Sequence, residues 1–342
     1  MSAKTLGDIG EAEVIRIFAE GGPPPGPRVV VENGDDAFAF APRPDHAVVA
    51  TTDSLVEGTH FLLKGRPREI YLPEDIGRKL MRANLSDLAA MGADPVAALI
   101  SVHASLDIPV ELAQGIARGI AAEALAHEVY IAGGNVTRIE GPLVLAATLI
   151  GEVRSQAILR KNRAQEGDRI FVTGTLGDAR LGLLLSREPE ELDQLSIQPA
   201  DAAHVLSALH RGRAAVIAGM LLTELGFVHA VADISDGLAR DLERMLRSRG
   251  LGARVDRSAI PLSAAAQRVG PLLGVDPTAA AVLGGEDYEL LITVAPSDGE
   301  ALQAALDNVA IEITEIGEVT RGPRIEIEAG QGLEGFDHFR KT

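Results

Sequence analysis

Hydroxyl and carboxylate side chains gather at three places in the first third of the chain. Thr51, Thr52 and Asp53 directly follow small, mostly β-branched residues that predict a short buried strand, so we expect them at its end. Asp36 closes a turn of two adjacent carboxylates, and Asp87 lies within a helical pattern. Gathered carboxylates repel one another unless cations neutralise them, and oxygen ligands without cysteine or a histidine pair suit hard ions such as Mg²⁺. Because Mg²⁺ in proteins usually serves bound phosphates, these residues predict a magnesium and phosphate site.

The helix predicted over residues 74–91 carries one carboxylate within an apolar stripe. At about 100° per residue, the stripe contains Ile76, Leu80, Ala83, Asp87 and Ala90. An ionised carboxylate on such a face is costly unless a basic group or a cation meets it. The alternative is that Asp87 caps a neighbouring loop. Asp36 also has a simpler explanation, because aspartate is common in turns.

A further polar cluster precedes a predicted amphipathic helix in the second half of the chain. Asp233 and Asp236 flank Ser235 directly before the helix expected over residues 238–249. The main-chain N–H groups at a helix start favour an anion, and the carboxylates could hold a metal ion beside it. Alternatively, Asp236 caps the helix.

The elements that must position these residues alternate between strands and helices. We expect helices at 4–20, 74–91 and 111–127, and a strand at 129–132 that ends in the turn Gly133-Gly134-Asn135. The chain becomes polar and basic between residues 151 and 168, which indicates a domain boundary. The prediction is an α/β fold with mixed sheets, in domains of residues 1–152 and 153–342.

Composition excludes several classes of protein. The chain has 342 residues, and its 49 acidic against 32 basic residues give a net charge of −17, which argues against a nucleic-acid partner or an anionic membrane surface. There is no cysteine, so disulfides and thiolate chemistry are excluded. No apolar run reaches about 18 residues and no cationic leader begins the chain, so we expect a cytoplasmic location.

Six motifs in this order closely resemble thiamine-monophosphate kinase, of the aminoimidazole ribonucleotide synthetase superfamily. They are GDDAFAF at 34–40, TTDSLVEGTHF at 51–61, NLSDLAAMGADP at 84–95, ADISDGLARDL at 232–242, GGEDYELL at 284–291 and GFDHF at 335–339. The resemblance implies two α/β domains with the nucleotide between them, and an N-terminal sheet that pairs with its twin into a dimer barrel. It implies transfer of the γ-phosphoryl group of ATP to thiamine monophosphate, with several Mg²⁺ ions and a homodimer.

The resemblance also assigns roles to individual residues. The implied magnesium ligands are Asp36, Thr51, Thr52, Asp53, Asp87, Asp233 and Asp236, with Asn135 where the family usually has an aspartate. The implied nucleotide contacts are Gly134, Asn135, Arg160 and Ser235, and the implied substrate contacts are His60, Glu286 and Phe336. No general base is assigned, because a phosphate acceptor with a second pKa near 6 is already a nucleophile at neutral pH. His60 is expected to hydrogen-bond the substrate; a base or a core histidine are the alternatives.

Two other readings compete with a thiamine kinase. Another ATP-using enzyme of the superfamily is one, although selenophosphate synthetase and the hydrogenase-maturation member both depend on cysteine or selenocysteine, which this chain lacks. Aminoimidazole ribonucleotide synthetase fits the TTDSLVEGTHF and GGEDYELL strings less well. The other reading is a non-catalytic module that binds thiamine phosphate or nucleotide, which Asn135 favours. A scaffold role leaves the carboxylate of Asp87 on an apolar stripe without an explanation.

The Asn135→Asp variant is expected to keep its activity, or to raise it at limiting Mg²⁺. Asparagine retains a carbonyl oxygen for the cation but lacks the charge that aspartate supplies. Initial rates of thiamine diphosphate formation across a Mg²⁺ titration test this expectation. A severe loss of activity would mean that position 135 has acquired another role.

Overall fold

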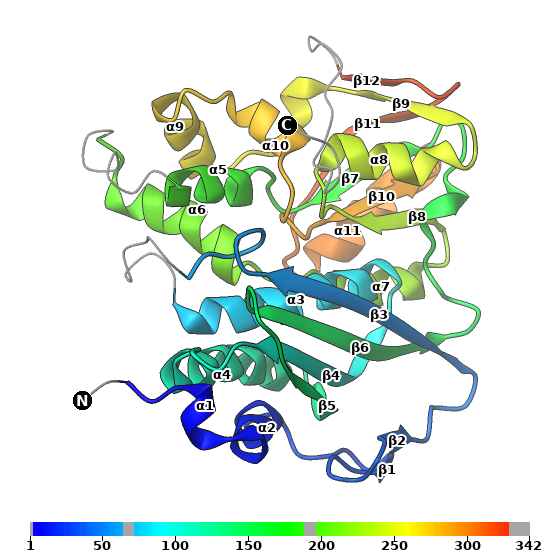
Figure 1. The fold of residues 1–342 in the computed structure, drawn as a ribbon. Helices are drawn as coiled ribbons and strands as arrows, with labels where there is room; N and C mark the ends of the chain where they lie inside the picture. The colour runs from blue at the N-terminus through cyan, green and yellow to red at the C-terminus, as the bar shows by residue number, and fades with distance from the viewer. Residues whose placement is uncertain (1–2, 64–71, 188–195, 328–342) are drawn as a thin grey trace. The chain divides into compact units, whose positions relative to one another are not determined.

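The computed structural model describes residues 3–63, 72–187 and 196–327. The chain divides into two compact units (Figure 1). Unit 1 comprises residues Met1–Leu88 and Ala93–Ser155, and unit 2 comprises Ala89–Gly92 and Gln156–Thr342.

Unit 1 is built on a four-stranded mixed sheet in the order β3-β6-β4-β5. Its strands are β3 (His46–Val56), β6 (Val144–Arg154), β4 (Asp94–Ala104) and β5 (Tyr130–Arg138). β3 and β4 each pair antiparallel with β6, whereas β5 pairs parallel with β4. The edge strands of this sheet are therefore β3 and β5.

Two long helices of unit 1 approach each other through glycines. These are α3 (Pro73–Ala90) and α4 (Val110–Ala126), as the sequence predicted. A Cβ atom on Gly77 would lie 2.0 Å from the carbonyl oxygen of Ile116, and one on Gly119 would lie 1.9 Å from that of Glu74. α3 is also buried around its circumference, since Lys79, Arg82, Asn84 and Ser86 are buried beside its apolar residues. The apolar stripe predicted for this helix is therefore only part of its buried surface.

The N-terminal helix predicted over residues 4–20 is in fact two helices, so this prediction was wrong. α1 (Leu6–Ile9) and α2 (Glu11–Ala19) meet at Gly10, whose φ of 78° lies outside the right-handed helical region. The apolar spacing continues across the break, which is why periodicity alone did not reveal it.

A small hairpin precedes the main sheet and carries the first acidic turn. β1 (Val29–Val31) pairs antiparallel with β2 (Ala39–Phe40), and the segment 33–37 between them is exposed. Two strands of this length are marginal by themselves, so contacts with the rest of unit 1 must hold them.

β3 is longer than predicted, and this corrects the expected position of Thr51, Thr52 and Asp53. The strand continues to Val56, so the three residues lie in its middle and not at its end. Successive side chains therefore point to opposite faces of the sheet. Thr51, Asp53 and Leu55 are half-buried or buried, whereas Ala50, Thr52 and Ser54 are exposed.

β5 also continues through residues predicted as a turn. Gly133-Gly134-Asn135 lies inside the strand, opposite an irregularity between Ala98 and Leu99 of β4. A Cβ atom on Gly134 would lie 1.7 Å from the carbonyl oxygen of Ile100. Gly133 has φ 142° and Gly134 has φ 157°, values that side chains disfavour. The paired glycines thus permit a bulge and a close approach of two backbones.

Unit 2 contains a six-stranded mixed sheet in the order β12-β9-β11-β7-β10-β8. Its strands are β7 (Arg169–Thr173), β8 (Val228–Asp233), β9 (Leu251–Val255), β10 (Leu290–Val294), β11 (Ile313–Arg321) and β12 (Ile325–Ile327). β12 pairs parallel with β9, and the other pairs are antiparallel. Both units thus have the mixed α/β architecture that the sequence predicted.

Seven α-helices accompany this sheet within the described residues. They are α5 (Asp178–Arg187), α6 (Pro199–Arg211), α7 (Val216–Leu225), α8 (Leu238–Arg247), α9 (Ala264–Leu272), α10 (Pro277–Leu283) and α11 (Gly299–Asp307). Short 3-10 helices occur at Lys161–Arg163, Arg257–Ala259 and Pro296–Asp298. The apolar face of α8, with Leu238, Leu242 and Met245, packs into the main core of unit 2.

In the described part of the chain, no single helix is long and apolar enough to cross a membrane, although α6 and α7 together, bent by 66°, meet that test of length and composition.

The Gly119→Ala variant is expected to be less stable than the wild type. An added methyl group would overlap the carbonyl of Glu74, and such overpacking costs about 1–3 kcal/mol, more than the higher helix propensity of alanine returns. Thermal unfolding measures the effect, and Gly26→Ala is the control because a Cβ atom at Gly26 has no neighbour within 4 Å. An unchanged unfolding temperature for Gly119→Ala would contradict the described packing of α3 on α4.

Candidate functional site

The structure brings together two of the predicted metal ligands of unit 1. Thr51 lies on β3 and Asp87 on α3, and the hydroxyl of Thr51 donates a hydrogen bond to Oδ2 of Asp87. Asp87 is half-buried and has this polar partner. Its carboxylate is therefore not surrounded by apolar groups alone, although the sequence places it within an apolar stripe. Asp53 is two residues beyond Thr51 on the same face of β3. One side of the sheet thus carries the hydroxyl of Thr51 and the carboxylate of Asp53 from β3, together with the carboxylate of Asp87 from α3.

Thr52 does not share this face with its neighbours. Its hydroxyl donates to the carbonyl oxygen of Ala147 at 3.1 Å and accepts from the hydroxyl of Thr148 at 3.1 Å. The side chain of Thr52 is exposed, whereas those of Thr51 and Asp53 are half-buried. A ligand role for Thr52 on the Asp53 side would have to come from its main-chain carbonyl.

Asn135 lies on the opposite edge of the sheet from Asp53. The pairing runs from Asp53 of β3 through Ala147 and Ile100 to Gly134 of β5, next to Asn135. Three strand spacings of about 4.8 Å separate these edges by roughly 14 Å. Nδ2 of Asn135 donates to the hydroxyl of Thr137 at 2.8 Å. Two ligands of one Mg²⁺ ion lie within roughly 4 Å of each other, so Asp53 and Asn135 of a single chain do not hold one ion together.

The acidic turn that contains Asp36 lies beside the start of β5. The main-chain N–H of Asn33 donates to the hydroxyl of Tyr130 at 2.9 Å, and its side-chain amide donates to the carbonyl of Ile131 at 3.5 Å. Asp36 itself is exposed, and its N–H donates to Oδ1 of Asp35 at 2.7 Å. The turn is therefore anchored on its N-terminal side at the β5 edge.

His60 lies in the turn that follows β3. Its Nδ1 accepts a hydrogen bond from the main-chain N–H of Val56 at 3.0 Å, and its carbonyl oxygen accepts one from Nζ of Lys79 at 2.9 Å. Because Nδ1 acts as an acceptor, the neutral ring carries its proton on Nε2. This tautomer can donate a hydrogen bond from Nε2, which supports the expected substrate contact over a role as a base.

In unit 2, the segment after β8 is held by a carboxylate that the sequence analysis missed. Oδ2 of Asp241 accepts hydrogen bonds from the main-chain N–H groups of Ser235 at 3.0 Å and Asp236 at 2.8 Å. Burial raises the pKa of Asp241 to about 6, and the charge of Asp236 adds to this increase. The helix N-cap is Gly237, so Asp236 does not cap α8. The one available signal was an acidic residue in the first turn of the predicted helix.

Asp236 has a cationic partner in the structure. Nη1 of Arg244 donates to Oδ2 of Asp236 and, at 3.2 Å, to Oδ1 of Asp241.

Arg160 is exposed, and its carbonyl oxygen accepts a hydrogen bond from the N–H of Val231 at 3.3 Å. Arg160 is thus attached through its main chain to β8, the strand that ends at Asp233.

The loop that contains Glu286 packs directly on this segment. The N–H of Glu286 donates to the carbonyl of Ser235 at 2.8 Å, and that of Tyr288 donates to the carbonyl of Ile234 at 2.9 Å. A Cβ atom on Gly285 would lie 2.4 Å from the Ser235 oxygen, so only glycine permits this approach. The structure therefore places the predicted substrate residue Glu286 beside the predicted nucleotide residue Ser235.

Two carboxyl groups that follow Glu286 in the sequence, those of Asp287 and Glu289, have pKa values that burial shifts. The N–H of Gly177 donates to Oδ1 of Asp287 at 3.0 Å, whereas Oδ2 has no hydrogen-bond partner among the described residues. Burial raises the pKa of Asp287 well above its usual value of 3.8, and the negative charges of Glu289 and Asp178 add to the increase. Burial also raises the pKa of Glu289. The hydrogen bond that Glu289 accepts from the hydroxyl of Thr173 lowers this pKa, but by less than burial raises it.

The predicted site residues form two local groups in the described parts of the chain. Unit 1 holds Thr51, Asp53 and Asp87 on one face, and unit 2 holds Asp233, Ser235, Asp236 and Glu286 in two paired segments. Phe336 lies outside the described residues. Within residues 3–63, 72–187 and 196–327, no three His, Cys, Asp or Glu side chains form a group that could hold a metal ion. The oxygen donors of each group nevertheless suit Mg²⁺, which usually takes one or two carboxylates together with water and substrate phosphates.

Two family models match most of the chain. The AIR synthase related protein, N-terminal domain, matches residues 34–153, and the corresponding C-terminal domain matches residues 165–330. A thiamine-monophosphate kinase from Rhodopirellula baltica is 34% identical over 300 residues, which cover 86% of this chain and 84% of that protein. The chain belongs to the thiamine-monophosphate kinase family. This membership confirms the resemblance that the six motifs indicated.

Solved structures of the thiamine-monophosphate kinase family share the fold. The crystal structure of the enzyme from Stenotrophomonas maltophilia has a TM-score of 0.77 and 33% identity, and covers 93% of this chain and 95% of that chain. A structure described as AaThiL complexed with AMPPCP and TMP has a TM-score of 0.75 and 28% identity, and covers 87% of this chain and 89% of that chain. A two-domain mixed α/β fold is therefore shared over nearly the whole length.

The Asp287→Asn variant is expected to gain stability relative to the wild type as pH rises. The folded-state pKa of Asp287 lies above its unfolded value of 3.8, so the folded wild type binds the extra proton and loses stability as pH rises from 3.8 through the folded pKa. Asparagine removes this dependence and keeps an acceptor for Gly177. Unfolding temperatures compared across this range test the prediction, with the exposed Asp307→Asn as control. A difference from the wild type that does not change with pH would contradict it.

Proposed function

We propose that the protein phosphorylates thiamine monophosphate with ATP. An oxygen of the thiamine monophosphate phosphate group bonds to the γ-phosphorus of ATP, while the bond from that phosphorus to the β,γ-bridging oxygen breaks. The products are thiamine diphosphate and ADP. The observation that carries the proposal is 34% identity to a thiamine-monophosphate kinase over 84% of that protein, with Thr51 and Asp87 of the matching motifs in contact. The structure described as complexed with AMPPCP and TMP supports the two substrates.

The transfer is direct and in line, without a phosphoenzyme intermediate. The acceptor phosphate is already anionic at neutral pH, so the side chains need not remove a proton from it. The barrier comes from bringing two anions together, and the protein lowers it by positioning and charge neutralisation. His60 serves as a hydrogen-bond donor through Nε2, since its Nδ1 is already engaged by Val56.

The chemistry of the donor atoms fits Mg²⁺ as the accompanying cation. Bound Mg²⁺ would neutralise phosphate charge during transfer. The residues that would hold it are Asp36, Thr51, Thr52, Asp53, Asp87, Asn135, Asp233 and Asp236. Asp53 and Asp87 present half-buried carboxylates, and the hydroxyl of Thr51 fixes the orientation of Asp87.

The segment after β8 in unit 2 would bind phosphate groups of the nucleotide. Asp241 fixes the main chain of Ser235 and Asp236 directly before α8, where helix N–H groups favour anions. Gly134, Asn135, Arg160 and Ser235 are the proposed nucleotide contacts. Glu286 is the proposed thiamine contact in this unit, together with Phe336, which lies outside the described residues. The proposal thus gives both domains, residues 1–152 and 153–342, a part in one cytoplasmic reaction.

We further propose a homodimer in which the sheets of two unit 1 copies pair into a barrel. The face of β3 that bears Val48, Ala50 and Thr52 is exposed, with Val48 50% accessible. Asp53 and Asn135 lie on opposite edges of the sheet in one chain. A second copy would let a site combine an Asp53 edge with an Asn135 edge.

The assay that decides the proposal combines the protein with ATP, Mg²⁺ and thiamine monophosphate. Thiamine diphosphate and ADP are expected in equal amounts, and both should be lost on chelation of the cation. Binding of both substrates without product across a Mg²⁺ titration would favour the non-catalytic module. Release of ADP only with another acceptor would favour a different enzyme of the superfamily.

The Asp87→Asn variant tests the unit 1 group in the same assay. We expect kcat to fall at least roughly 100-fold, which corresponds to about 3 kcal/mol of transition-state stabilisation. The amide retains the shape of the side chain and an acceptor for Thr51 but lacks the charge. Asp307→Asn, at an exposed position in α11, is the control and should retain the wild-type rate. A normal rate in Asp87→Asn would remove this carboxylate from the mechanism.

A further inference from the structure

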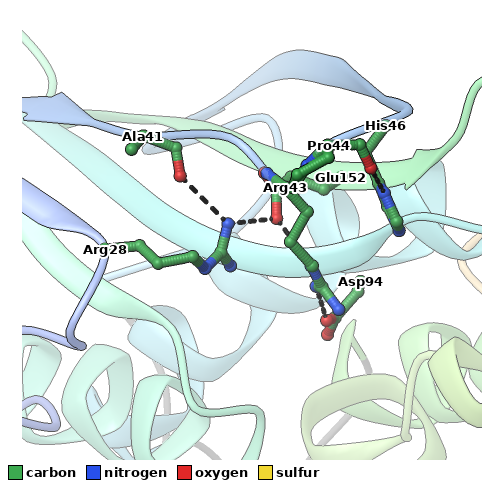
Figure 2. A network of polar contacts seen from close by, with 7 residues as sticks. All are labelled: Arg28, Ala41, Arg43, Pro44, His46, Asp94 and Glu152. Atoms are coloured by element: carbon green, nitrogen blue, oxygen red, sulfur yellow. Dashed lines mark hydrogen bonds and ion pairs between the residues drawn. The ribbon is translucent and has the colours of Figure 1, made fainter.

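A buried glutamate holds both ends of the segment that carries the acidic turn. Glu152 on β6 is 1% exposed. Figure 2 shows its side chain joined by dashed contacts to Arg28 and Arg43. Its Oε2 accepts from Nη1 of Arg28 at 2.6 Å and from Nε of Arg43 at 2.9 Å, and its Oε1 accepts from the main-chain N–H of Arg43 at 2.7 Å. One carboxylate on the sheet thus receives three donors from two arginines.

These two arginines lie on either side of the hairpin of unit 1. The chain between them contains β1, the exposed turn with Asp35 and Asp36, and β2. Nη1 of Arg28 also donates to the carbonyl of Ala41 at 3.3 Å, and the N–H of Ala41 donates to the carbonyl of Arg28 at 2.8 Å. Both ends of the segment from Arg28 to Arg43 are therefore bonded to the same side chain, Glu152.

The far end of the same segment is held at β5. Asn33 is bonded to the hydroxyl of Tyr130, and the ring of Phe38 lies 5.6 Å from that of Phe40 and 6.0 Å from that of Tyr130. Asp36 lies between Asn33 and Phe38 in sequence. Contacts on both sides of Asp36 in the sequence thus hold the hairpin against β5.

At the base of the hairpin, the positive charges of Arg28 and Arg43 lie beside the carboxylates of Glu152 and Asp94. Burial alone would raise the pKa of Glu152, but hydrogen bonds from Arg43 and Arg28 outweigh burial and lower it. Hydrogen bonds to Asp94 and Glu152 raise the pKa of Arg43. Glu152 is therefore ionised at neutral pH. Only the glutamate is buried, since the side chains of Arg28 and Arg43 are 36% and 38% exposed. Solvent-exposed partners limit the net stability that such a pair contributes, so fixed geometry is the more direct gain.

We propose that Glu152 is a positioning residue that fixes the acidic turn for cation binding through Asp36. The inference rests on the proposed function, in which Asp36 is a magnesium ligand. Glu152 does not touch the cation or the substrates; it acts through Arg28 and Arg43. Removal of its charge frees the base of the hairpin, so the turn samples more positions and binds a divalent cation more weakly.

The Glu152→Gln variant of the full chain tests the proposal with a readout independent of turnover. Mn²⁺ binding to the nucleotide-free protein, followed by the electron paramagnetic resonance signal of free Mn²⁺, is expected to weaken roughly tenfold. Hydrogen exchange in the peptide that covers residues 29–42 should accelerate. The KM for thiamine monophosphate at saturating Mg²⁺ should change less than twofold.

A matched control separates positioning from general stability. Asp201 is buried and accepts two hydrogen bonds from Arg268, at 2.8 and 2.7 Å, within unit 2. Asp201→Asn removes a comparable charge pair and should leave Mn²⁺ affinity and exchange at residues 29–42 unchanged. If Asp201→Asn weakens Mn²⁺ binding as much as Glu152→Gln does, the effect is one of stability and the proposal is wrong.

The outcomes distinguish this proposal from the proposed function. Wild-type production of thiamine diphosphate, with normal Mn²⁺ affinity in Glu152→Gln, overturns the role of Glu152 and leaves the kinase assignment intact. A wild type that neither binds Mn²⁺ nor forms product overturns both proposals. If Glu152→Gln does not fold, Arg28→Met removes one donor from a partly exposed position and should weaken Mn²⁺ binding in the same direction.

Discussion

The hydrogen bond from Thr51 to Asp87 is the contact on which the proposed site of unit 1 depends. It links the middle of an edge strand to a helix that is buried around its circumference, so neither partner has much freedom to move. The strand pleat then decides which neighbours can join them: Asp53 lies on the same face, and Thr52 does not. A short polar motif is thereby divided between the two faces of a sheet.

In unit 2, polar residues are held together by main-chain hydrogen bonds and not by a contact between a strand and a helix. Its polar residues lie in two loops that are joined by main-chain hydrogen bonds between the carbonyls of Ile234 and Ser235 and the N–H groups of Tyr288 and Glu286. Glycine at position 285 permits the approach, and Asp241 holds the turn from within the following helix. The polar residues of these two loops are therefore held by main-chain contacts and by a carboxylate of the following helix. Glu152 plays the corresponding part for the acidic turn of unit 1.

The sequence predicted the long helices and the mixed α/β class because their apolar periodicity is strong. It also identified the family, since six collinear motifs carry far more information than any one of them. It failed where glycines interrupt or extend an element: Gly10 divides the first helix, and Gly133-Gly134 continues a strand through a bulge. It missed Asp241 and Glu152 because their importance comes from main-chain and arginine donors that are distant in sequence or on another element. Pairing partners of this kind follow from the tertiary fold and not from local pattern.

The central claim is that carboxylates of both units serve one phosphoryl transfer. The most direct measurement is a crystal structure of this chain with AMPPCP, thiamine monophosphate and Mg²⁺. We expect cations coordinated by phosphate oxygens together with Asp53 or Asp87 of unit 1 and Asp233 or Asp236 of unit 2. Cations or nucleotide bound away from these carboxylates, or coordinated by the residues of one unit alone, would contradict it.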